Sequence, residues 1–108
     1  MNGAMLLPAL LQIIATDSGA QTSDWQRHMS QRVCQIASPA ALDALVSTRE
    51  GGVSVKKSVL SGWEGIANGS VSWTISKTEW FKPTRSLMIV YQPDNSCNAV
   101  MSLHSFDP

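Results

Sequence analysis

The chain has 108 residues, of which 44% are hydrophobic and 15% charged, and its eight basic and eight acidic side chains give a formal net charge of zero. This length and composition predict one packed domain rather than two. The zero net charge lacks the basic field on which nucleic-acid binding depends, and no apolar run reaches the roughly 18 residues of a membrane span. We therefore expect neither a nucleic-acid partner nor an integral membrane span.

The N-terminal segment contains an apolar block from Ala4 to Ala15. The block is too short to cross a bilayer but is typical of the hydrophobic region of a secretory signal, and Ser18-Gly19-Ala20 resembles a cleavage site before Gln21. Against this interpretation, no Lys or Arg precedes the block, and the alternative is an N-terminal helix docked on the core. We expect residues 1–20 to be a signal peptide or N-terminal apolar segment and residues 21–108 to form a single domain.

An amphipathic helix is expected over residues 22–37. Ser23 or Asp24 can cap its start by accepting from the first free backbone N–H groups. An apolar stripe at helical spacing follows, as expected for a helix that covers a core. Its members are Trp25, Met29, Val33 and Ile36.

A second, short helix is expected from Pro39 to Thr48. Ser38-Pro39 ends one helix and starts another, because proline disfavours helix in the residue before it and suits a first turn. Gly51-Gly52 then favours a stop, since glycine readily takes the left-handed conformation of a helix end. The apolar residues of this helix are Ala41, Leu42, Leu45 and Val46.

Four β-rich segments complete the chain. The clearest is Ser70 to Trp80, in which Val71, Trp73 and Ile75 alternate with polar residues, so that one face is dry and the other wet. Val53 to Leu60 precedes it. Leu87 to Tyr91 is apolar on both parities, which predicts burial on both faces. In the last segment, Asn98 to Leu103, the inward residues are expected to be Ala99, Met101 and Leu103.

The turns between these segments are short. Asn68-Gly69 and Pro93-Asp94-Asn95-Ser96 are strong turn sequences. Short turns favour antiparallel neighbours, because parallel pairing needs long crossovers. The sequence therefore predicts an α+β domain in which an N-terminal helix pair packs on one face of a four-stranded, mainly antiparallel meander sheet.

The two cysteines, Cys34 and Cys97, are expected to form one disulfide if the chain is exported. Such a bond would join the first expected helix to the turn before the last strand. Two alternatives remain open: a pair of inert buried thiols, or a reactive thiol with His28 or His104 as its base.

No metal or cofactor site is expected. The only histidines are His28 and His104, and they lack the HxxxH spacing of a helical metal site. Asp24 or Asp107 would have to join them from a distance. Other carboxylates are scattered, so a site assembled from distant residues stays open as an alternative. They are Asp43, Glu50, Glu64, Glu79 and Asp94.

The aromatic residues are the one feature that suggests a binding surface. The chain has four tryptophans, and tryptophan is enriched at recognition surfaces. Trp63 falls in a loop. The position of Trp80 in its strand places its side chain on the other face of the strand from that of Trp73. We expect Trp63 and Trp80 to share a partly exposed patch with Phe81 and Tyr91. The alternative is that Trp63 folds back over the core edge, while Trp80 and Phe81 cover a second small cluster.

These observations predict a small exported protein, secreted or periplasmic, that is stabilised by one disulfide and is not an enzyme. Its partner would be another protein, bound through the aromatic patch, as for an inhibitor, an immunity-type protein or an envelope component. The alternative is a small hydrolase or an enzyme accessory subunit whose site is built from scattered polar residues.

Overall fold

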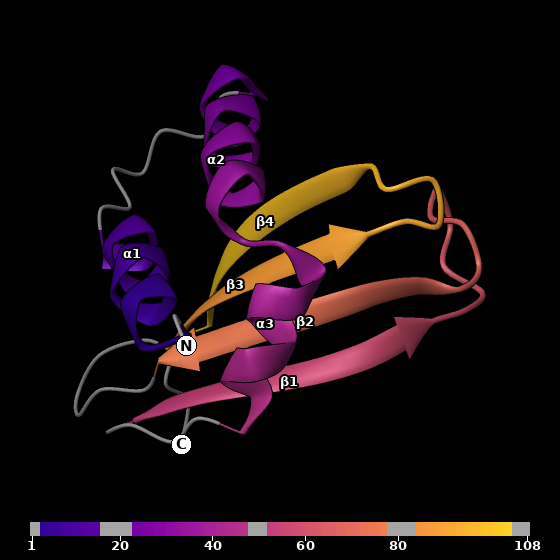
Figure 1. Cartoon of the computed structure of the whole chain (residues 1–108). Coiled ribbons are helices and arrows are strands. Elements are labelled where there is room, and N and C mark those ends of the chain that lie inside the picture. The colour runs from indigo at the N-terminus through magenta and orange to yellow at the C-terminus, as the bar shows by residue number, and fades with distance from the viewer. Residues whose placement is uncertain (1–2, 16–22, 48–51, 78–83, 105–108) are drawn as a thin grey trace.

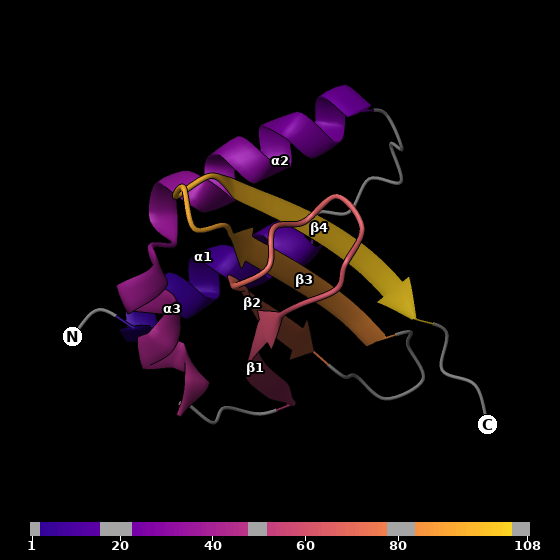
Figure 2. The same cartoon turned by 90° about the vertical axis from the view of Figure 1, so that its right-hand side faces the viewer.

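The computed structural model describes residues 3–15, 23–47, 52–77 and 84–104. Within these ranges three helices precede four strands, and the helices lie on one face of the sheet (Figures 1 and 2). The predicted α+β class is therefore confirmed. The elements are α1 (Gly3–Ala15), α2 (Ser23–Ile36), α3 (Pro39–Val46), β1 (Val53–Leu60), β2 (Ser70–Lys77), β3 (Thr84–Tyr91) and β4 (Cys97–His104).

The sheet is the expected meander. Its order is β1-β2-β3-β4, and each strand is antiparallel to its neighbour. The register places Trp73 opposite Ile89 and Ile75 opposite Leu87, so the apolar residues of the two central strands share one face. All four of these side chains are buried, because the helices cover that face.

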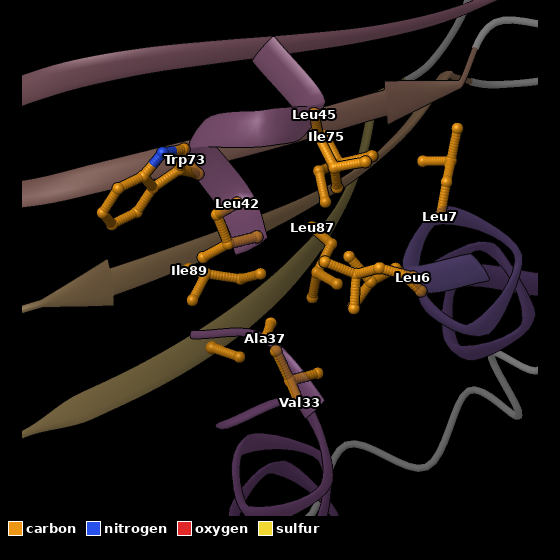
Figure 3. Close-up of a cluster of buried hydrophobic side chains, with 12 residues drawn as sticks. Leu6, Leu7, Val33, Ala37, Leu42, Leu45, Trp73, Ile75, Leu87 and Ile89 are labelled. Atoms are coloured by element: carbon orange, nitrogen blue, oxygen red, sulfur yellow. The ribbon is translucent and has the colours of Figure 1, made fainter. Parts of the chain in front are cut away.

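The helices pack on the apolar face of the sheet and contribute the rest of the core (Figure 3). α3 contributes Leu42 and Leu45, and the end of α2 contributes Val33 and Ala37, all fully buried. α1 adds three buried leucines, Leu6, Leu7 and Leu10. In the whole chain, the N-terminal apolar segment is therefore a helix docked on the core. Cleavage before Gln21 would remove this helix, and that processing step stays a prediction.

The start of α3 confirms the expected interruption between the helices. Ser38 is its N-cap, and the Ser38 hydroxyl accepts a hydrogen bond from the Ala41 N–H at 3.2 Å. Pro39 occupies the first turn, where its missing N–H has no intrahelical role. The helix ends at Val46, and Thr48 lies outside the described residues.

The apolar stripe expected on α2 is wrong at its last member. Ile36 is 42% exposed, while the next residue, Ala37, is fully buried. The Ala37 N–H still bonds to the Val33 carbonyl, so the helical turn continues through it and turns Ala37 rather than Ile36 toward the sheet. The side chains of Trp25 and Met29 lie outside the described set.

The strand predictions hold with two qualifications. β2 is described as far as Lys77, and the expected continuation to Trp80 falls outside the described residues. In β3, Val90 is buried on the face away from the helices, but Met88 on that face is only half-buried. Burial on both faces therefore applies to part of this strand. In β4, the expected inward residue Ala99 is buried, while the side chains of Met101 and Leu103 lie outside the described set.

The face turned away from the helices is rich in serine. Ser54, Ser76, Ser86 and Ser102 stand opposite one another in register across all four strands. The Ser76 and Ser86 hydroxyls are 3.3 Å apart and share a hydrogen bond. The polar parity of β2 places its serines on this face, but the expected wet face is wrong in part, because Ser70, Ser72 and Ser86 are buried.

We predict that Trp73→Ala lowers the free energy of unfolding by about 3–5 kcal/mol, as expected for truncating a buried tryptophan. Trp73 is 2% exposed, whereas Trp63 is 53% exposed and provides the matched control. Trp63→Ala should change the free energy by less than about 0.5 kcal/mol, as for an ordinary surface substitution. Urea melts of the two variants make the comparison, and equal losses would show that Trp73 is not a core residue.

Candidate functional site

The helix α2 lies beside β4, the last strand of the sheet, and two links hold it there (Figures 1 and 2). The first is the Cys34–Cys97 disulfide, which joins positions 63 residues apart with Cα atoms separated by 6.1 Å. That separation lies within the usual range for disulfides. The predicted bond is confirmed, and because it uses both cysteines, the alternative of a reactive thiol is wrong.

The second link is a double hydrogen bond from Ser30. The Ser30 hydroxyl donates to the Ala99 carbonyl and accepts from the Ala99 N–H, both at 3.0 Å. Both backbone groups of Ala99 therefore point away from β3, toward the open side of the sheet. An edge strand presents such groups to any chain that can pair with them. Ser30 satisfies one pair of them from within the molecule.

A groove of about 620 Å³ separates α2 from β4. Its size falls within the roughly 300–1,000 Å³ of small-ligand sites. Val100 is 49% exposed and Asn98 is exposed, so the groove opens to solvent on the serine-rich side of β4. Its lining residues are Arg27, Ser30, Gln31, Cys34, Cys97, Asn98, Ala99 and Val100. We call this site the α2–β4 groove.

The chemistry of the α2–β4 groove is that of a binding site. Of the lining residues that the structure describes, Arg27 is the charged one, and Gln31, Asn98 and Ser30 add amide and hydroxyl groups. Among the described residues of the lining, none is a carboxylate or imidazole that would serve as a general acid or base. The sequence analysis predicted that Cys34 and Cys97 would meet. It did not predict that Arg27, Ser30 and Gln31 would line a groove, and the cysteine pairing was the only sequence signal that placed this part of the helix near the last strand.

The residues predicted to form an aromatic patch have different surroundings. Trp63 is exposed in the loop after β1. Tyr91 is half-buried: its hydroxyl donates to the Ala37 carbonyl at 2.6 Å, and its ring meets Trp73 edge-on at 6.0 Å. That is the one ring pair found among the described residues, and Trp80 and Phe81 lie outside them. A patch shared by all four residues stays a prediction.

A second polar cluster lies where α3 meets the sheet. Asp43 Oδ1 accepts hydrogen bonds from Lys57 Nζ at 2.9 Å and from Trp73 Nε1 at 3.0 Å. Lys57 Nζ is also 5.5 Å from the centre of the Trp73 ring. The hydrogen bond from Lys57, and after it that from Trp73, lowers the pKa of Asp43 below its ordinary 3.8. The cluster anchors α3, because it satisfies the N–H of a buried tryptophan.

The remaining candidate residues form no shared site in the described part of the chain. His28 is exposed on α2, and the side chain of His104 is outside the described set. No group of three His, Cys, Asp or Glu residues there has the arrangement needed to hold a metal ion. Among the same residues, no helix has the length and apolar character of a membrane span.

Comparisons of this chain with protein-family models, with curated proteins and with solved structures found no match. The α2–β4 groove is a candidate site of the described residues, and a covalent bond and a double hydrogen bond hold its two sides together.

We predict that loss of the disulfide lowers the free energy of unfolding by about 4 kcal/mol, from the entropy of closing so long a loop in the unfolded chain. The double variant Cys34→Ser/Cys97→Ser should melt at a lower urea concentration than the oxidised protein. Reduced wild-type protein should match the variant, which itself should not respond to reductant. Two free thiols in unreduced, denatured protein would contradict the bond.

We predict that Asp43 contributes a pH-dependent part of the stability. Because its pKa is lower in the folded protein, this contribution is present above about pH 4, the range of an unfolded aspartate. It is lost as the pH falls through the folded value. Asp43→Asn should remove it, and Lys57→Met should reduce it by raising the pKa of Asp43. Urea melts between pH 2 and 7 test this, and curves parallel to wild type would contradict it.

Proposed function

We propose that this chain is a small exported, non-enzymatic protein that binds a segment of another protein in the α2–β4 groove. The observation that carries the proposal is the groove itself, which lies beside the open edge of the sheet and has the Cys34–Cys97 bond in its lining. An inhibitor, an immunity-type protein or an envelope component would act in this way.

Export is supported by two independent features. Structural disulfides persist in oxidising compartments and are rare where thiols are kept reduced. The bond fixes the wall of the groove to its floor, so the binding site itself depends on oxidation. The apolar block from Ala4 to Ala15, with small residues before Gln21, is typical of a secretory signal. A secreted or periplasmic location is therefore part of the proposal.

Binding is favoured over catalysis by the groups that line the groove. One guanidinium, two amides and one hydroxyl hold and orient a ligand, but none of them is a general base near neutral pH. Such a site recognises a partner rather than transforming it.

Photocrosslinking in the cells that produce the protein tests the binding proposal. A photoreactive amino acid at Gln31, in the groove, should give a discrete adduct with another protein. The same amino acid at Lys56, exposed on β1, is the matched control and should give none. A discrete adduct at Lys56 with none at Gln31 would place the binding surface elsewhere and refute the proposed site.

Intact-mass measurement and thiol titration of the same protein test export. We expect a chain that begins at Gln21 and has no free thiol. Because Leu6, Leu7 and Leu10 belong to the core, such a chain should expose apolar surface and bind a hydrophobic dye more strongly than the whole chain does. A product with its first residues intact and two free thiols would contradict export.

A further inference from the structure

We propose that two loops at one end of the sheet form a rigid recognition surface, which inserts Trp63 into an apolar cleft with a basic rim on another protein. The first, the Trp63 loop, is residues 61–69 between β1 and β2, and the second, the Pro93 loop, is residues 92–96 between β3 and β4. Figure 1 shows both at the end of the sheet farthest from α1. The proposal goes beyond the proposed function, because the lining of the α2–β4 groove includes neither loop.

The two most exposed large hydrophobic side chains of the described residues lie at this end. Val59 is 69% exposed and Trp63 is 53% exposed. Val59 is the last residue but one of β1, so it comes directly before the Trp63 loop. Tryptophan is among the residue types that most often dominate the free energy of protein recognition. Trp63 is therefore a candidate anchor, with Val59 as a further apolar contact.

The Trp63 loop has a defined backbone conformation at its tip. The Ile66 N–H donates to the Trp63 carbonyl at 3.3 Å, which closes a turn with Glu64 and Gly65 at its centre. Gly65 has a φ of 79°, as the third residue of a type II turn requires. Beyond its chain neighbours, no atom lies within 4 Å of the place where a Cβ would stand, so this glycine serves the turn and not the packing. The turn presents Trp63 and Glu64 together.

Gln92 ties the two loops to each other. Its Oε1 accepts from the Ala67 N–H at 3.3 Å, and its Nε2 donates to the Ser96 hydroxyl at 3.2 Å. The Gln92 backbone closes the Pro93 loop, because its N–H donates to the Ser96 carbonyl at 2.9 Å and its carbonyl accepts from the Asn95 N–H at 2.8 Å. A surface that is ordered before it binds loses less conformational entropy on binding. The two loops therefore form one preorganised surface.

The charge at this end of the sheet is negative. Glu64 and Asp94 are exposed, and residues 58–71 and 91–98, all of them described, contain no Lys, Arg or His. The Asp94 carboxylate accepts hydrogen bonds from the Ser96 N–H at 3.0 Å and from the Ser96 hydroxyl at 2.7 Å. These bonds lower the pKa of Asp94, so it stays ionised near neutral pH. The chain as a whole has no net charge, so this negative charge is local.

The anchor and the charge together define the partner. A tryptophan at the tip of a loop buries its ring most completely in a concave apolar slot. Carboxylates around it favour Lys and Arg on the rim of that slot, and an arginine there is also attracted to the face of the indole ring. The same negative charge opposes nucleic acid and anionic lipid surfaces. A cleft on another protein is therefore the occupant that this surface fits.

Photocrosslinking in the cells that produce the protein begins the test. A benzophenone amino acid replaces Ser61, which is exposed in the Trp63 loop, and the same amino acid at Lys56, exposed on β1, is the matched control. We expect a discrete protein adduct at Ser61 and none at Lys56. The joined protein is identified by mass spectrometry and purified, and its dissociation constant for the whole oxidised chain is measured.

Variants of the whole chain then separate the anchor from the charge. Trp63→Ala should weaken binding by about tenfold or more, as expected for truncating an anchor. Val46→Ala removes a 40% exposed apolar side chain from α3 and is the matched control, with an affinity close to wild type. Glu64→Lys should weaken binding most at low salt, because salt screens its repulsion from a basic rim. Glu64→Gln should have a smaller effect.

Three results would overturn the inference. They are the absence of an adduct at Ser61, a partner for which Trp63→Ala and Val46→Ala have equal affinity, and tighter binding by Glu64→Lys. The proposed function is decided separately by the crosslink at Gln31. An adduct at Gln31 without one at Ser61 would leave the groove as the binding site and refute the loop surface. An adduct at Ser61 alone would support the loop surface and count against the groove.

Discussion

Covering one face of a four-stranded sheet is the constraint on which the rest of the molecule depends. The large aromatic residues of that face also carry polar atoms, and a buried indole N–H or phenol needs a partner. Trp73 finds its partner in Asp43 on α3, and Tyr91 finds its partner in the Ala37 carbonyl between α2 and α3. These two hydrogen bonds fix where the helices meet the sheet. Apolar packing alone would define the position of the helices less specifically, because it is not directional.

The position of the candidate site follows from this arrangement. α3 lies against β1, and α1 packs its leucines between the other two helices and the sheet, so α2 comes to lie beside β4 (Figures 1 and 3). There the Cys34–Cys97 bond and the Ser30 hydroxyl hold it against the edge of the sheet at Cys97 and Ala99. A helix fixed beside the last strand of the sheet makes a groove between them, and the proposed binding of a segment of another protein depends on that geometry.

Much of the fold was predictable because local patterns carried it. Period-2 alternation in β2, the proline restart at Ser38-Pro39 and the turn residues between strands each reflect short-range physics. The site was predictable only at Cys34 and Cys97. Arg27, Ser30 and Gln31 are ordinary polar residues of an amphipathic helix, and no local pattern shows which of them will face a strand so distant in sequence. The exposure of Ile36 was missed for a related reason, since helical spacing alone does not say where the covering contact ends.

The sequence by itself therefore determined the class of the fold, the order and direction of the strands, the apolar face of the sheet and the only pairing open to its two cysteines, while the structure showed that the bond forms. These depend on periodicity, on turn chemistry and on there being only two cysteines to pair. Tertiary structure alone decided that α1 belongs to the core of the whole chain, that Tyr91 bonds to a helix end, and that Ser30 caps the edge at Ala99. The physical reason is that these contacts join segments far apart in the chain, whose meeting depends on how helices pack over the sheet.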